Sequence, residues 1–164
     1  MVAPAKPGAI FEGTPGFSAD STVTISLTNC TQATTTATLK SYYDTNYTPL
    51  GFNIVDGEYG VYLMPAVIPV SVVVGDSGII GTITTYTNST KTTQTGREDV
   101  SYMVGPDATN TAMVNLIFKI YNPAGVLSST EQDRYSVTID GVITAVSKII
   151  EDISTLVTIS LTLE

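Results

Sequence analysis

The chain has 164 residues and a formal net charge of −8, and charged residues make up 13% of it, against about 25% in typical soluble domains. This length fits one ordinary domain, and the acidic balance excludes the basic patch that a nucleic-acid partner or an anionic membrane surface requires. Threonine is the commonest residue and takes the place of the missing ions, a composition typical of surface layers and packed assemblies.

The first residues are rich in proline and glycine and show little hydrophobic periodicity. We predict an extended N-terminal arm over residues 1–16 and a single β-sandwich domain over residues 17–164. No signal peptide is visible, so either the protein is made without one or Met1 replaces a removed one. The longest apolar run, residues 61–74, is interrupted by Pro65 and Pro69 and is shorter than the ~18 residues of a membrane span, which predicts no membrane insertion.

Alternation of apolar and hydroxyl side chains begins at Ser21 and predicts β-strands along most of the chain. Turn pairs such as Asp56-Gly57 and Asp140-Gly141 separate them. The expected strands cover residues 21–28, 34–43, 50–55, 59–64, 68–74, 79–87, 99–104, 111–121, 134–139 and 155–164.

One segment, residues 142–154, has a different pattern. Ile143, Val146, Ile150 and Ile153 fall at helical spacing, which predicts a short amphipathic helix. With about nine strands at regular spacing and one helix, the fold class is all-β, an antiparallel two-sheet sandwich or jelly roll.

A six-residue segment occurs twice, as Val23–Thr28 and as Val157–Thr162, both reading VTISLT. Chance is one explanation in a sequence so rich in Thr and Val. The alternative is that two equivalent strands at opposite ends of the chain compete for one sheet position, which strand exchange between subunits requires.

The chain has few of the residues that usually carry out catalysis, with no histidine and one cysteine. Gly75-Asp76-Ser77-Gly78 resembles the nucleophile signature of trypsin-like serine proteases, but that mechanism needs a histidine base, and the chain contains no histidine. The tetrapeptide is better explained as a turn in which Gly supplies positive φ and Asp caps the backbone. We therefore expect no enzyme activity.

Cofactors are not expected either. The metal most compatible with the composition is calcium, which takes oxygen ligands from loops. Carboxylates expected in or near loops are Asp56, Glu58, Glu98, Asp99, Asp107 and Asp133. Cys30 is the single cysteine, so no disulfide forms within the chain, and a core or strand position is the favoured interpretation.

Tyrosine is the commonest aromatic residue, and Tyr42, Tyr43 and Tyr47 cluster in sequence. Tyrosine favours interfaces and ligand surfaces because it combines an apolar ring with a hydrogen-bonding tip. The main hypothesis is a structural homo-oligomer that self-assembles through edge strands and the arm, as a virion shell, extracellular filament or surface layer. The alternative is an extracellular or virion-surface lectin or adhesin that binds a glycan on these three tyrosines or through an acidic loop with calcium.

Overall fold

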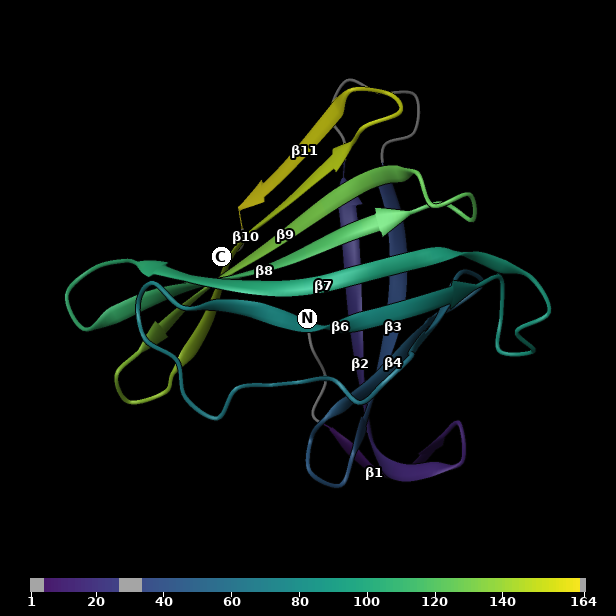
Figure 1. Cartoon of the computed structure of the whole chain (residues 1–164), viewed down its shortest axis with the longest axis horizontal. Coiled ribbons are helices and arrows are strands. Elements are labelled where there is room, and N and C mark those ends of the chain that lie inside the picture. The colour runs from purple at the N-terminus through teal and green to yellow at the C-terminus, as the bar shows by residue number, and fades with distance from the viewer. Residues whose placement is uncertain (1–4, 27–33, 163–164) are drawn as a thin grey trace. The chain divides into compact units, whose positions relative to one another are not determined.

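The computed structural model describes residues 5–26 and 34–162, of which residues 23–26, 34 and 35 are described by their backbone alone. These residues form eleven β-strands and no helix, and the strands follow one another in chain order in one antiparallel sheet (Figure 1). The all-β prediction is thus confirmed. The strand number is eleven where about nine were expected, and the two-sheet sandwich stays a prediction.

The strand bounds are β1 Lys6–Phe11, β2 Thr14–Ser26, β3 Thr34–Asp44, β4 Pro49–Ile54, β5 Tyr59–Tyr62, β6 Ser77–Tyr86, β7 Gln94–Pro106, β8 Thr111–Tyr121, β9 Leu127–Thr138, β10 Ile143–Asp152 and β11 Val157–Thr162. Tight turns join several of them. Glu12 and Gly13, between β1 and β2, both have positive φ, at 50° and 80°. That combination is typical of the two-residue hairpin turn whose twist matches its strands.

The helix expected over residues 142–154 is wrong, because this segment is strand β10. The register with β9 shifts between Ala145 and Ser147, so Val146 is an extra residue in a β-bulge. Because the bulge adds one position to the alternation, Ile143 and Ile150 lie on the same face of the strand although they are seven residues apart. The same interval corresponds to about two turns of a helix. β-Branched residues favour the strand that forms.

The strand expected over residues 68–74 is also wrong, because residues 63–76 are irregular. Pro65 and Pro69 lack the N–H that a strand ladder needs. The hairpin turn expected over Gly75-Asp76-Ser77-Gly78 forms only in part, because Ser77 and Gly78 are the first residues of β6 and no strand covers residues 68–74. Gly75 has φ 102°, and the Asp76 carboxylate accepts a hydrogen bond from the Val73 N–H at 2.8 Å.

The chain divides into two compact units, Met1–Ala66 with Thr84–Thr95, and Val67–Ile83 with Gly96–Glu164. In the first unit, residues 6–11, expected within the arm, form β1 and pair with β2. Whether an arm and a single domain are the right division stays a prediction. Cys30 and the last two residues of the first VTISLT copy lie outside the described residues. The first four residues of that copy end β2, and the second copy is β11.

In the second unit, the register sorts side chains by polarity. Val114 lies opposite Val104 on β7 and Tyr135 on β9, which makes one face apolar. The next residue along β8, Asn115, lies opposite Met103 and Arg134, on the more polar face. The alternation that predicted β8 therefore corresponds to two chemically different faces of this part of the sheet.

Candidate functional site

The three tyrosines singled out in the sequence lie in β3 and the turn after it, but not on one face. In the β2–β3 register Tyr42 is opposite Ser18 and Tyr43 is opposite Phe17, so the two adjacent tyrosines point to opposite faces. Tyr47 is 64% exposed and stacks on Phe17, with ring centroids 4.9 Å apart. Tyr43 and Tyr47 thus share the Phe17 side, and a ligand or interface surface formed by all three stays a prediction.

Tyr42 belongs to an aromatic cluster in the first unit. Its ring stacks on Phe11 with centroids 4.4 Å apart, and Phe11 also contacts Tyr59 at 5.3 Å. Phe11 is only 5% exposed. Gly51 has φ 155°, and a Cβ there would lie 2.7 Å from the Phe11 ring and 2.1 Å from the carbonyl oxygen of Gly60, so the close packing requires glycine. The end of the expected arm is therefore part of a core.

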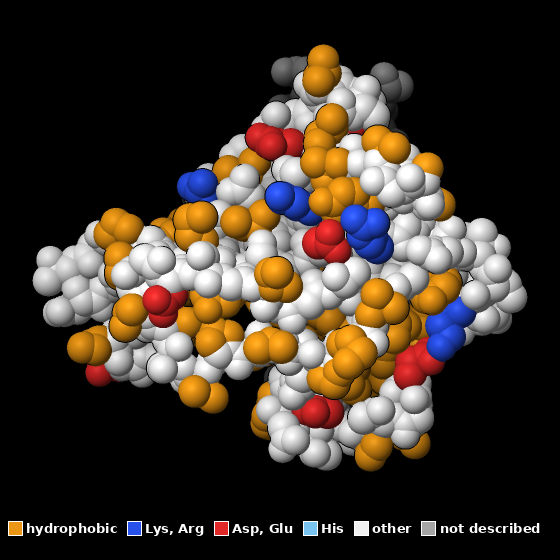
Figure 2. Space-filling view, in the orientation of Figure 1, with side chains coloured by type: hydrophobic (Ala, Val, Ile, Leu, Met, Phe, Trp, Pro, Cys, Tyr) orange, Lys and Arg blue, Asp and Glu red, His pale blue; other side chains and the backbone are white. Residues whose placement is uncertain are grey.

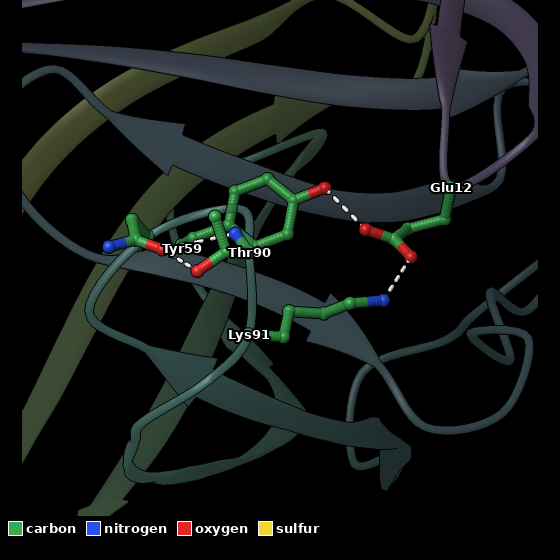
Figure 3. Close-up of polar contacts among 5 residues, drawn as sticks. Glu12, Tyr59, Thr90 and Lys91 are labelled. Atoms are coloured by element: carbon green, nitrogen blue, oxygen red, sulfur yellow. Dashed lines mark hydrogen bonds and ion pairs between the residues drawn. The ribbon is translucent and has the colours of Figure 1, made fainter.

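Glu12, in the turn that follows Phe11, connects three elements of the first unit (Figure 3). Its Oε1 accepts a hydrogen bond from the Tyr59 hydroxyl at 2.7 Å, and its Oε2 forms an ion pair with Lys91 in the loop before β7. The hydrogen bond from Lys91, and then that from Tyr59, hold the pKa of the Glu12 carboxyl below its usual value. Burial and the Glu12 carboxylate raise the pKa of Tyr59. These contacts fix the β1–β2 hairpin in place.

A pocket of about 330 Å³ lies beside this cluster in the first unit. Phe11, Leu50 and Met64 line its apolar side, and the polar side includes Glu12 and Asp44. Both carboxylates already interact with other groups of the protein through hydrogen bonds or an ion pair. Asp44 Oδ1 accepts the N–H groups of residues 46 and 48, each at 2.8 Å, and the hydrogen bond from residue 48 is the main cause of its lowered pKa. The pocket's acidic groups therefore order the adjacent turns.

The carboxylates considered for calcium are dispersed. Glu98 and Asp99 lie within β7 and Asp133 lies within β9, whereas Asp56, Glu58 and Asp107 lie in the segments between strands. Glu58 accepts a hydrogen bond from Thr95 at 2.6 Å, and Asp107 accepts one from Ser136 at 2.7 Å. Among the described residues, no three His, Cys, Asp or Glu side chains are grouped as a metal site. Calcium binding stays a prediction.

The two ends of the strand order differ in chemistry. β1 begins Lys6-Pro7-Gly8, its register shifts between Pro7 and Ala9, and Lys6 forms an ion pair with Asp20 at 2.7 Å. Charge, proline and a bulge are the features that discourage a further strand from pairing with an edge. β11 reads VTISLT, has no proline, glycine or charge, and pairs with β10 without a register shift. In the described part of the chain, no strand pairs with its other side.

Many large apolar side chains are exposed, and Figure 2 shows them over the visible face with few charged groups between them. In β11, Val157 is exposed and Ile159 is 42% exposed. The irregular segment 63–76 contains others, including Leu63, Met64 and Val70. Isolated exposed apolar residues are ordinary, but an uncharged edge strand with one apolar face, such as β11, is an unusual feature of a protein surface.

Sequence reasoning missed a charged cluster on the apolar face of the second unit. Lys148 on β10 lies directly opposite Asp133 on β9, and its Nζ contacts Asp133 Oδ1 at 2.9 Å and also Glu131. Burial opposes the charged lysine, but the two carboxylates outweigh it and raise the pKa of Lys148. A usable signal was present: Glu131 and Asp133 are two residues apart, so in a strand they share a face.

No helix among the described residues is long and apolar enough to cross a membrane. Comparison with known proteins finds no matching family model, no similar curated protein and no similar solved structure.

Proposed function

We propose that the protein is a non-enzymatic structural subunit that assembles with copies of itself through the edge of β11. The observation that carries this proposal is the contrast between the two ends of the strand order. β1 has a lysine, a proline and a bulge, whereas β11 has none of these. A virion shell, an extracellular filament or a surface layer is the setting that the low charge and high threonine content suit best.

The physical argument is that an edge strand presents a row of N–H and C=O groups that a further strand can satisfy. Ile153 to Leu163 is a run without an ionisable side chain, so approach of another strand removes no charge from water. The chain as a whole carries −8, so two copies repel at long range. Salt should therefore favour association, because it screens this repulsion.

A charge placed on the edge tests the proposal. Ile159→Lys should raise the dissociation constant for self-association by about 100-fold or more, because a lysine on an edge strand must be desolvated when a further strand packs there. The measurement is light scattering on a sizing column over a concentration series at 0.15 M and 0.5 M salt. Ile139→Lys, the same substitution at an exposed turn, is the matched control and should associate like the native chain.

Two results would contradict the proposal. One is a native chain that stays monomeric at millimolar concentration in both salts. The other is an Ile159→Lys variant that associates as strongly as the Ile139→Lys variant.

A further inference from the structure

The direction of the free backbone groups of β11 follows from one hydrogen bond. The Ile153 N–H donates a hydrogen bond to the Ser128 C=O at 2.9 Å, which continues the β9–β10 register. The backbone N–H and C=O groups of Ile153 therefore point toward β9. Because the direction of the backbone groups alternates along a strand, those of Ile150 point the other way, toward β11, where Ile150 is paired with Ile159. Ile159 therefore bonds to β10, and the backbone groups of Thr158 and Ser160 point to the open side.

The sequence of β11 is complementary to itself in the antiparallel register centred on Ile159. With Ile159 opposite the same residue of a second copy, Thr158 lies opposite Ser160, and Val157 lies opposite Leu161. The outward-facing Thr158 and Ser160 then form hydrogen-bonded pairs, and Ile159 forms the closer, non-hydrogen-bonded pair. Apolar side chains meet on one face and hydroxyl side chains on the other, so the second copy extends both faces of the sheet.

A register displaced by one residue loses this match. It would place Ile159 opposite Ser160 and Thr158 opposite Leu161, so apolar side chains would face hydroxyl side chains across the junction. It would also set outward-facing backbone groups against residues whose groups already bond to β10. Hydrogen-bond direction and side-chain alternation both repeat every two residues, so both exclude a register displaced by one residue. Among the registers that remain, the one centred on Ile159 pairs all three apolar side chains of β11 with one another, because Val157 lies opposite Leu161 and Ile159 lies opposite the same residue of the second copy.

We propose that two copies of this chain pair antiparallel through β11 around a two-fold axis at Ile159. This inference rests on the proposed function and specifies its contact: the partner is a second copy, and the same surface is used by both. A self-complementary contact of this kind closes into a dimer. One short strand on each side makes a small interface, so the dimer alone is weak, and further contacts would extend it into a larger assembly.

Cysteine cross-linking tests the register, in a Cys30→Ser background so that the introduced thiol is the single one. Ile159→Cys should form a disulfide-linked dimer under mild oxidation, because Cα atoms of a non-hydrogen-bonded pair lie about 4.5 Å apart, within disulfide range. Thr158→Cys alone should not, because its counterpart is displaced diagonally by about 7–8 Å. A mixture of Thr158→Cys and Ser160→Cys chains should link. Ile139→Cys, at an exposed turn, sets the background of random collision.

The outcomes separate this inference from the proposed function. If Ile159→Cys links no better than Ile139→Cys while Ile159→Lys still prevents association, β11 is an assembly edge but pairs with a different segment, and the two-fold contact is wrong. Linking of Thr158→Cys alone would indicate another register and would also overturn the inference. If neither association nor linking occurs, the proposed function fails as well.

Discussion

Phe11→Ala is expected to lower the free energy of unfolding by about 3 kcal/mol, the largest stability effect of any substitution considered for this protein. Phe11 is almost completely buried and contacts both Tyr42 and Tyr59, so truncation removes apolar burial and two ring contacts and leaves a cavity. Urea denaturation followed by tyrosine fluorescence provides the measurement.

The neighbouring residue on the same strand is the control. Ile10 is 72% exposed, so Ile10→Ala should change the free energy of unfolding by less than about 0.5 kcal/mol. Equal effects of the two substitutions on the free energy of unfolding would show that Phe11 does not pack β1 against the rest of the first unit. The prediction also bears on truncation: removing residues 1–16 should destabilise the fold itself, so loss of assembly after trimming would not by itself identify an arm contact.

Lys148→Met should destabilise the protein by about 2 kcal/mol at pH 7. The substitution keeps an apolar stem but leaves the carboxylates of Glu131 and Asp133 close together without their cation. Fully buried pairs cost about 3–5 kcal/mol to break, and the smaller value applies because the Lys148 side chain keeps 27% exposure. Denaturant unfolding of the variant and the native chain measures the difference.

The pH dependence follows from the raised pKa of Lys148. A cation whose pKa is higher in the folded state stabilises the protein below its unfolded pKa of about 10.5, and the contribution is lost as pH rises through the folded value. The difference between the native chain and Lys148→Met should therefore persist from pH 7 to 10 and shrink above about pH 10.5.

Two variants control for this interpretation. Lys119→Met, at an exposed position on β8, should cost less than about 0.5 kcal/mol. Adding Glu131→Gln to Lys148→Met should recover part of the lost stability, because it removes one of the two like charges. If the double variant is no more stable than Lys148→Met, carboxylate repulsion is not the cause.

Alternation gave the strand class correctly where strands are regular, as in β8, whose expected and observed bounds are both residues 111–121. It failed at β10, where the bulge at Val146 imitates helical spacing. It also failed over residues 68–74, where composition favoured a strand although Pro69 lies within it. Both errors concern the backbone groups, which local side-chain patterns describe poorly.

The candidate site was less predictable than the fold class. Tyr42 and Tyr43 both fall in the strand expected over residues 34–43, so their direction to opposite faces could already have been derived from strand geometry. The contact of Glu12 with Lys91 joins residues far apart in the chain, which no local pattern reveals. The β11 edge was partly foreseeable, because the repeated VTISLT had suggested exchange between subunits.

The central claim is that copies of the chain hydrogen-bond to one another along β11, and amide hydrogen exchange of this strand tests it most directly. In the associated protein, the amides of Thr158 and Ser160 should exchange more slowly than in the dilute monomer. Those of Ile159 and Leu161, already bonded to β10, should change little. Association that leaves the Thr158 and Ser160 amides exchanging as fast as in the monomer would contradict the claim.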